Sequence, residues 1–437
     1  MNTKLLDIII AITIFISFPA VSFASEEAAA TINSGDTAFM IIATAMVLIM
    51  TPALGLFYGG MERPKNMINI LMMSVILMGI TSVQWVLFGY SIAFGPTVGG
   101  FFGDTTFWGF NGVGVDPSPD YAPNLPHVLF SMFQMVFVMI TPAIISGAVA
   151  GRMRFGAYVL LMIAWITLVY EPICHMVWAI GGFIGKMGAL DFAGGTVVHI
   201  SSGTSALVAA LMIGKRRGIS GVRPHNVPFM LLGGGLLWFG WLAFCGGCAT
   251  VANGFSSLVI MNTNTAAGAG MLTWLLIEKL HHGKVTLLGA VTGAVAGLVG
   301  ITPSCGFVTT LSSIAIGILT APVCYIAIIF AKKKLGYDDA LDAFGLHGVG
   351  GIWGALLTGV FCTTTVNKAG TDGLFYGNAA QLIPQLGGVL VTIVWAGVAT
   401  FLILKVISIF TPLRATDEEE KQGMDLNQHG ETAYSSL

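Results

Sequence analysis

Long apolar runs separated by short polar loops recur along almost the whole chain. Eleven of these runs approach the roughly 20 residues that an α-helix needs to cross a bilayer. They lie at about 38–59, 72–94, 126–150, 156–178, 194–213, 227–248, 258–278, 285–302, 308–331, 345–364 and 382–411, and we number them segments 1 to 11. This pattern predicts an all-α polytopic membrane protein with eleven transmembrane helices. Glycine and proline inside several segments are typical of helices that cross closely or line a cavity.

Composition supports this class of protein. Hydrophobic residues make up 55% of the chain and charged residues 9%, whereas soluble domains carry roughly 25% charged residues. The 57 glycines suit close helix packing through small residues. The formal net charge is −2, so nothing indicates a nucleic-acid partner.

Positive charge falls on one side of the predicted helices. Apart from Lys4, sixteen lysines and arginines lie in alternate loops and the C-terminal tail, and only Lys186 and Lys368 lie on the other side. Because cytoplasmic loops carry the excess of Lys and Arg, this predicts a mature N-terminus outside and a C-terminus in the cytoplasm. An odd number of segments gives these opposite ends.

The two ends of the chain differ from the middle. Residues 1–24 resemble a secretory signal peptide, with Lys4 before the apolar run 8–21 and small residues before a cleavage site after Ala24. An uncleaved first helix is the alternative. We expect a membrane domain at 25–411 and a cytoplasmic tail at 412–437. The acidic run 417–420 in this tail either docks, binds a partner or is simply solvated.

The strongest internal signal is a repeated spacing. Asp191 precedes His199 by eight residues, and Asp339 precedes His347 by eight, each at the start of an apolar, glycine-rich segment. An aspartate at a helix N-terminus accepts backbone N–H bonds and favours the positive end of the dipole. An imidazole within a membrane helix is costly and is therefore a functional candidate. The alternative is two unrelated structural histidines.

This repetition predicts internal symmetry. Segments 1–5 and 6–10 form two halves, and because five is odd the second half must enter from the opposite side. The result is an inverted repeat with its site at the midplane between the halves. If His199 and His347 are adjacent, they share a hydrogen bond as neutral imidazoles, which suits a small uncharged solute or a proton relay.

Several aromatic residues are candidates for cation binding. Phe133 and Phe137 share a helix face, as do Phe244 and Cys248, and Trp178 ends segment 4 shortly before Asp191. Aromatic faces attract a cation by about 0.5–2 kcal/mol. Taken singly, each phenylalanine is as readily explained by packing, and Trp178 by the interfacial belt. Spacing alone does not show that they converge.

The six cysteines are not a disulfide framework, because all lie in or beside apolar segments. Cys245 and Cys248 form a C-x-x-C pair. There is no second pair and no soluble redox fold around it, so we predict no metal site, no cofactor and no catalytic residue.

Sequence motifs then indicate a family. DFAGGTVVHI at 191–200 and DAFGLHGVGGI at 342–352 resemble the Amt/Mep/Rh ammonium transporter family. So do the following motifs, which cover nearly the whole mature chain in order: GLFYGGM at 55–61, FGYSIAFG at 88–95, HMVW at 175–178, GLVGITPSCG at 297–306 and HGETAY at 429–434. Retention of Trp178 favours the bacterial AmtB-like branch over the Rh branch.

The resemblance implies a homotrimer with a central pore in each subunit. It implies that Trp178, Phe133 and Cys248 hold ammonium in an outer vestibule, with Asp191 supporting the site without touching the ion. Phe137 and Phe244 would form the gate below, and His199 and His347 the paired pore histidines. It also implies block by a P-II family signal protein at the cytoplasmic face of a bacterial inner membrane.

The chain departs from the family at three positions. Cys245 and Cys248 stand where the family usually has Asn and, in many bacterial members, Ser, and Gly151 stands where it usually has Glu before Arg152. A thiol is a weaker hydrogen-bond donor than a hydroxyl, so we expect a weaker outer site. The glycine suggests that an inner ion pair is missing.

The predicted function is ammonium transport rather than catalysis. NH₄⁺ (or methylammonium) gathers outside and loses its proton, NH₃ passes the histidines, and the family resemblance favours net charge transfer. Two rivals remain at this stage. One is an ammonium sensor signalling through the tail, and the other is a membrane redox protein with a bis-histidine haem.

Overall fold

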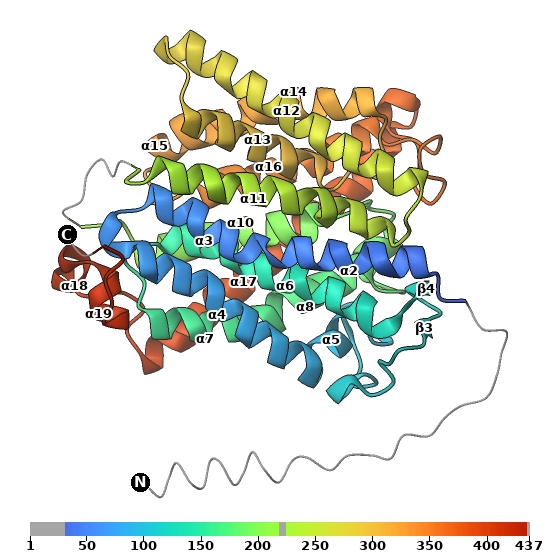
Figure 1. Ribbon diagram of the computed structural model, residues 1–437, viewed down its shortest axis with the longest axis horizontal. Coiled ribbons are helices and arrows are strands. Elements are labelled where there is room, and N and C mark those ends of the chain that lie inside the picture. Colours follow the sequence, from blue (N-terminus) through green and yellow to red (C-terminus); the bar gives the residue numbers. More distant parts are fainter. Residues whose placement is uncertain (1–30, 218–223, 435–437) are drawn as a thin grey trace, which may run out of the picture. The chain divides into compact units, whose positions relative to one another are not determined.

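The computed structural model describes residues 31–217 and 224–434, so the predicted signal peptide lies outside the described residues. Each of the eleven predicted segments corresponds to a helical stretch (Figure 1). The first five are α2 (Ser34–Leu48) with α3 (Met50–Met61); α4 (Met67–Gln84), η2 (Trp85–Gly89) and α5 (Tyr90–Phe94); α6 (His127–Val149); α7 (Phe155–Trp165), η4 (Ile166–Tyr170) and α8 (Glu171–Trp178); and η5 (Gly195–Ile200) with α10 (Ser201–Ile213).

The remaining segments follow the predicted order. They are α11 (Val227–Gly246) with η6 (Gly247–Ala249); α12 (Gly254–His282); α13 (Leu287–Ile301); α14 (Thr310–Ile326), η7 (Ala327–Ala331) and α15 (Lys332–Leu335); η8 (Phe344–Gly348) with α16 (Val349–Phe361); and α17 (Leu382–Phe410). Outside the segments lie three short helices, α9 (Phe183–Lys186), α18 (Asp417–Gln422) and α19 (Met424–His429). There are also four 3-10 turns among the described residues: η1 (Pro64–Asn66), η3 (Trp108–Phe110), η9 (Leu374–Tyr376) and η10 (Ala379–Gln381). Two small hairpins pair β1 (Thr97–Val98) with β2 (Phe102–Gly103) and β3 (Pro117–Ser118) with β4 (Ala122–Pro126).

The helices fit a membrane-spanning bundle. In the described residues, nine helical stretches are long and apolar enough to cross a membrane. Two segments fall outside that set for different reasons. Segment 8 is apolar but only 15 residues long, and segment 7 has 29 residues but carries the polar run Asn262-Thr-Asn-Thr265 inside the helix. The prediction of an all-α polytopic membrane protein is confirmed.

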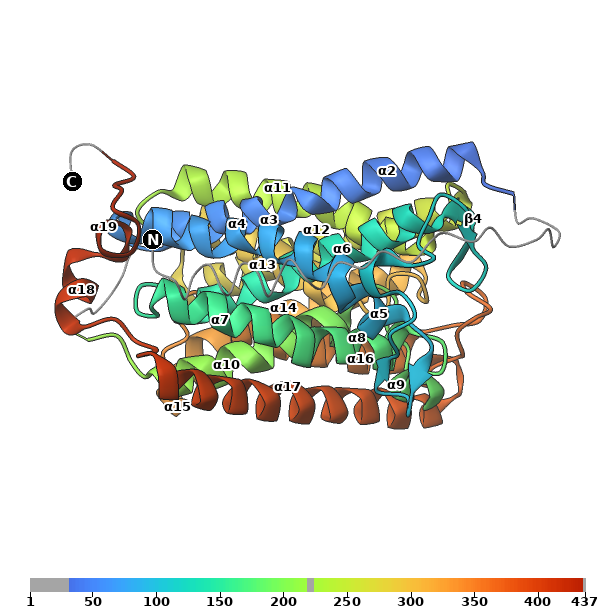
Figure 2. The same ribbon diagram turned by 90° about the horizontal axis from the view of Figure 1, so that it is seen from below.

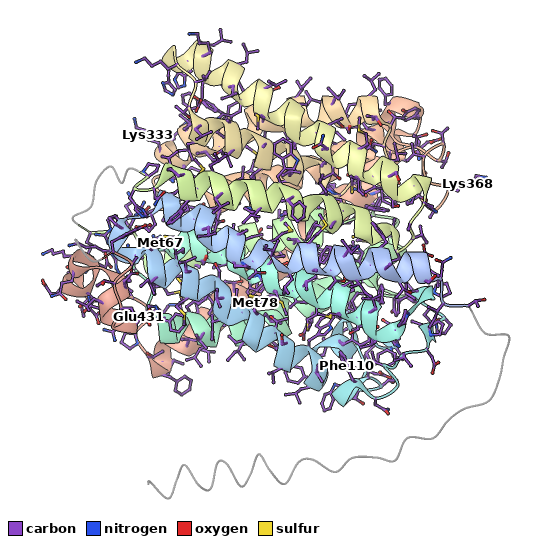
Figure 3. The ribbon with its side chains drawn as sticks, viewed as in Figure 1. Met67, Met78, Phe110, Lys333, Lys368 and Glu431 are labelled. Atoms are coloured by element: carbon purple, nitrogen blue, oxygen red, sulfur yellow. The ribbon has the colours of Figure 1, made fainter. Side chains whose placement is uncertain are left out.

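The two ends of the bundle carry different loops. Lys333 and Lys368, which the charge pattern assigned to opposite sides, lie at opposite ends of the long helices (Figure 3). Helices α18 and α19 lie at the Lys333 end, and α17 runs along one side of the bundle (Figure 2). These two lysines therefore lie on opposite sides, as the loop charges predicted.

Five segments contain a π-helical turn, which inserts an extra residue and shifts the helix register. The turns are η2, η4, η5, η7 and η8. Segments 5 and 10 both begin with one, and each turn packs against the α-helix of the other segment. A Cβ on Gly203 would lie 2.2 Å from the Gly348 backbone nitrogen. The two Asp-x₇-His stretches therefore meet at a close glycine crossing.

Candidate functional site: a vestibule, a gate and paired histidines

Asp191 organises the start of segment 5. Its carboxylate accepts backbone N–H bonds from Gly194 (2.9 Å), Gly195 (2.6 Å), Thr196 (2.7 Å) and Val197 (3.3 Å), and also the Thr196 hydroxyl. Its backbone oxygen accepts the Trp178 indole N–H at 2.8 Å. The predicted cap is confirmed, because the carboxylate is turned to the helix rather than to open space. The same residue also orients Trp178.

Asp339 caps segment 10 with fewer bonds and in deeper burial. It accepts N–H bonds from Ala343 (3.1 Å) and Phe344 (2.7 Å) and is fully buried. Burial and then the nearby Asp342 charge raise the pKa of Asp339 to about 6, although Lys332 and the two N–H bonds oppose that rise. For the adjacent Asp338, bonding to Arg216 outweighs burial and lowers the pKa to about 2.

The two histidines meet inside the bundle. Their Nδ1 atoms are 3.2 Å apart, and both rings are almost completely buried. They line one apolar cavity with Phe244 and other large side chains: Met50, Leu54, Phe57, Ile140, Ile144, Val198, Leu237, Trp241 and Val295. Because the imidazoles contact each other directly, no haem plane fits between them, which removes the bis-histidine haem reading.

Hydrogen-bond counting assigns the direction of this contact. The Thr302 hydroxyl donates to the Leu298 carbonyl at 2.7 Å and accepts from the Trp241 indole at 2.9 Å. Its one hydrogen is therefore used, and towards His199 Nε2 at 3.4 Å it only accepts. Neutral His199 then carries its hydrogen on Nε2, and its Nδ1 accepts from the Nδ1–H of His347.

Two phenylalanines close the cavity on the other side of His199. The Phe137 and Phe244 rings stack with centroids 4.0 Å apart and 16° between planes. Phe244 is 6.4 Å from the His199 ring, and Phe137 is 6.0 Å from Trp178. Both phenylalanines are buried. The rings thus form a plug between the Trp178 side and the histidines.

A second cavity lies beyond this plug. It is lined by Phe133, Trp178 and Cys248, the three residues that the resemblance assigned to one site, and by Gln134, among others. The Cys248 thiol points back to the Phe244 carbonyl at 3.2 Å. Sequence spacing could not show this convergence, which the structure supplies from three different segments.

Some residues of the site were missed by the sequence. The Trp241 ring stacks on the His199 ring with centroids 5.2 Å apart, and the Thr302 hydroxyl is hydrogen-bonded to both side chains. Gln134 lines the vestibule, and its buried Oε1 atom has no hydrogen-bond partner among the described residues. The i,i+3 spacing of Trp241 and Phe244 was a usable signal. Thr302 and Gln134 carried none beyond their polarity in an apolar segment.

The structure shows which groups surround Gly151 and Arg152, where the family usually has Glu before Arg. Among the described residues Arg152 makes no ion pair, and its side chain donates to the Asp338 carbonyl. The buried Glu62 carboxylate lies beside Gly151, where a Cβ would be 3.3 Å from its Oε1. Glu62 is 3.9 Å from Arg216 and 3.7 Å from Arg63. A carboxylate is thus present at this position, but it comes from segment 1.

The C-terminal tail docks on this same end. Arg63 donates to the Glu420 carbonyl at 2.8 Å, and Arg154 pairs with Glu419 at 3.0 Å. The Asp425 carboxylate accepts the Asn69 N–H at 2.8 Å. The tail is therefore tied to segments 2 and 4 and to the loop after segment 1, which answers the docking alternative left open by the sequence.

The fold and the site define a polytopic helical membrane protein with an apolar cavity that is lined by two imidazoles and bounded by stacked aromatic rings. Residues 38–434 match the family model described as Ammonium Transporter Family, and the chain belongs to this family. It is 52% identical over 400 residues to "Ammonium transporter" of Bacillus subtilis (strain 168), covering 92% of this chain and 98% of that protein.

Two further proteins extend the likeness. The chain is 44% identical to "Ammonium transporter" of Aquifex aeolicus (strain VF5) over 98% of each chain. Among solved structures, Saccharomyces cerevisiae Mep2 matches with a TM-score of 0.85 and 36% identity, over 93% of this chain and 92% of that one. The predicted family is confirmed by sequence and by fold.

Proposed function

We propose that this protein transports ammonium, by recruiting NH₄⁺ at the vestibule, deprotonating it and conducting NH₃ past His199 and His347. The observation that carries the proposal is the order of the site: an aromatic pocket, a stacked phenylalanine plug and a directly hydrogen-bonded pair of buried imidazoles in an apolar cavity. The names of the relatives support the same substrate.

Each part of the site has a physical role in this proposal. Trp178 and Phe133 attract the cation through their ring faces, and Cys248 and Gln134 offer acceptors for its N–H groups. Asp191 fixes Trp178 and adds negative charge near the ion. Phe137 and Phe244 exclude water. The ion is costly in an apolar pore, by about 2.5–3.5 kcal/mol or more, so the neutral molecule crosses.

The proton is part of the proposal. The Nδ1–H of His347 faces His199 Nδ1, so the pair forms a short hydrogen-bonded chain. We propose that net positive charge crosses with each ammonia, with the imidazoles on the proton's path. Methylammonium, which keeps donors on a small cation, would use the same site.

The setting of the transporter is also proposed. Residues 1–24 are a cleaved signal peptide, 25–411 are the membrane domain and 412–437 are the tail. The protein lies in the bacterial inner membrane, with the mature N-terminus outside and the docked tail in the cytoplasm. It forms a homotrimer, which native mass measurement tests, and its cytoplasmic face offers a site for a P-II family protein.

The decisive experiment records the transient current after an ammonium pulse on proteoliposomes, with internal pH in parallel. Wild type, His199→Ala and the exposed control Ser257→Ala are compared. Current in wild type and in the control but not in His199→Ala is the expected result. A pH change without current would mean that only neutral NH₃ passes. No current and no pH change, with ammonium binding retained, would favour the sensor alternative.

A further inference from the structure

A stripe of polar side chains runs between segments 2 and 4, outside the pore. Segment 4 contributes Thr167, Glu171 and His175, which follow one another at four-residue spacing and so share one face. Facing them are Gln84 on segment 2 and Thr97 in the strand that follows it. Hydrogen bonds join Gln84 to Thr167 and His175 to Thr97. We call these five residues the polar stripe.

The centre of the polar stripe is Glu171. Its side chain is fully buried within segment 4, and neither carboxyl oxygen has a hydrogen-bond partner among the described residues. It faces Gly89 of segment 2, where a Cβ would lie 2.3 Å from Glu171 Oε1. Only glycine leaves room for the carboxyl group at this position, so the space around it is shaped by the backbone of both helices.

Both helices carry a π-helical turn beside Glu171. η2 ends at Gly89, and η4 ends at Tyr170, immediately before Glu171. Such turns are frequent at functional sites because they re-aim side chains. Two such turns lie beside one unpaired carboxyl group. The pore does not explain this arrangement, because no residue of the polar stripe lines the pore cavity or the vestibule cavity.

The protonation state follows from the surroundings. An ionised carboxylate without partners inside a membrane segment is strongly unfavourable. The titratable groups close to Glu171 are Tyr170 and Cys174 on its own helix, segment 2 presents Gly89 to it, and among the described residues it forms no ion pair. Glu171 therefore carries a proton in the packed state.

His175 offers this proton a route to solvent. Its Nδ1–H donates to the Ala93 carbonyl at 3.1 Å, so in the neutral ring Nε2 is the acceptor and receives the Thr97 hydroxyl at 2.8 Å. Thr97 is exposed at the end of the bundle that carries the hairpins. Glu171 is one helical turn further in on the same helix, and the route places one bridging water between its carboxyl group and His175 Nε2.

We propose that Glu171 is a membrane-buried proton-binding site, separate from the ammonia pore, that exchanges its proton with the outer solution through His175 beside Thr97. In each exchange the Glu171 carboxyl O–H breaks and His175 becomes an imidazolium. The imidazolium then releases a proton from Nε2 to water, and the reverse sequence reloads the carboxylate. The ionised form places an unpaired charge between segments 2 and 4, so it loosens their packing.

Infrared difference spectroscopy of the purified full chain tests the site directly. The carbonyl stretch of a protonated carboxylic acid is measured in wild type, Glu171→Gln and the exposed control Glu418→Gln. We expect a buried-acid band at pH 8, where Asp339 with its pKa of about 6 is ionised, that is lost in Glu171→Gln and kept in Glu418→Gln. Its absence from wild type, or its presence in Glu171→Gln, would overturn the site. The readout needs no ammonium, so it succeeds or fails independently of the transport proposal.

The route is tested by the rate at which that band shifts on transfer to D₂O. With His175→Gln, which keeps polarity but cannot relay a proton, the shift should slow by roughly 10²-fold, whereas Cys174→Ser should leave it unchanged. Equal rates in wild type and His175→Gln would overturn the route. Because a misfolded variant would exchange faster rather than slower, slowing cannot come from loss of structure.

Discussion

The starts of segments 5 and 10 share the Asp-x₇-His spacing, but their aspartates have different electrostatic surroundings. Asp191 is half-exposed and accepts four backbone N–H bonds, with no ion-pair partner among the described residues. Asp339 is fully buried, accepts two, and lies close to Asp342 and Lys332.

The two aspartates differ in the groups that surround their carboxylates. The Asp191 carboxylate beside the vestibule is held by backbone N–H groups and the Thr196 hydroxyl. At the other end, Lys332 pairs with Asp342 and Arg216 with Asp338, beside the buried Asp339. Both aspartates thus cap a helix start, and the number of hydrogen bonds, the burial and the charged neighbours differ.

Removing each cap should expose the asymmetry most strongly. Asp191→Ala leaves four backbone N–H groups without their acceptor and should lower the free energy of unfolding by about 4 kcal/mol, and Asp339→Ala by about half of that when both are measured at pH 5. Transport should be lost in Asp191→Ala. Thermal unfolding in detergent with parallel transport assays measures both. Equal losses would mean that the number of bonds does not set the difference.

The glycine crossing is the next test. A Cβ on Gly203 of segment 5 would lie 2.2 Å from backbone, whereas one on Gly351 of segment 10 would lie 2.9 Å from the His199 side chain. Gly203→Ala should cost about 3 kcal/mol and Gly351→Ala about 1 kcal/mol, because the overlap with neighbouring atoms is deeper at Gly203. Unfolding midpoints compare them, and Gly397→Ala, 3.5 Å from the Thr204 side chain, is the mild control.

The two histidines should also be unequal. His199→Ala removes the acceptor for His347 together with the contacts to Trp241 and Thr302, so the current should fall by about 10²-fold. His347→Ala removes one donor and should reduce it about tenfold. Steady and transient currents at saturating ammonium decide the order. The reverse order would place the main proton contact on segment 10.

The pH dependence of the free energy of unfolding should distinguish Asp339 from its neighbour Asp338. Its pKa is raised to about 6 in the folded chain, so its stabilising contribution is present below about pH 4 and is lost as pH rises through 6. The unfolding free-energy difference between wild type and Asp339→Asn should fall by about 2–3 kcal/mol from pH 4 to 7.

Asp338→Asn is the matched control. The pKa of Asp338 is lowered to about 2, so its contribution is present above about pH 4 and is lost only as pH falls through 2. Between pH 4 and 7 its difference from wild type should stay flat. A slope of the same sign in both variants would mean that the pH dependence has another source.

The smallest expected effect concerns the vestibule. A hydroxyl at position 248 is a better hydrogen-bond partner than the thiol, so Cys248→Ser should tighten apparent ammonium affinity about threefold, or less than 1 kcal/mol. The concentration dependence of the current measures it. An unchanged affinity would mean that the aromatic faces alone set binding at this end.

The sequence determined the elements and their chemistry. Apolar runs of membrane length fixed eleven helical segments, the loop charges fixed their alternation, and the two Asp-x₇-His stretches marked both caps and both histidines. These are local properties, set by the hydrophobic requirement of the bilayer and by the hydrogen bonds of a helix start.

Only the tertiary structure decided which side chains meet. The contact of His199 with His347 joins residues 148 positions apart, and the Phe137–Phe244 stack depends on how two helices rotate about their axes. π-helical turns shift the register by one residue with no signal in the hydrophobic pattern, and one of them brings Gly89 to face Glu171. Glu62 beside Gly151 likewise arises from packing between segments, because spacing along a chain does not specify distances between helices.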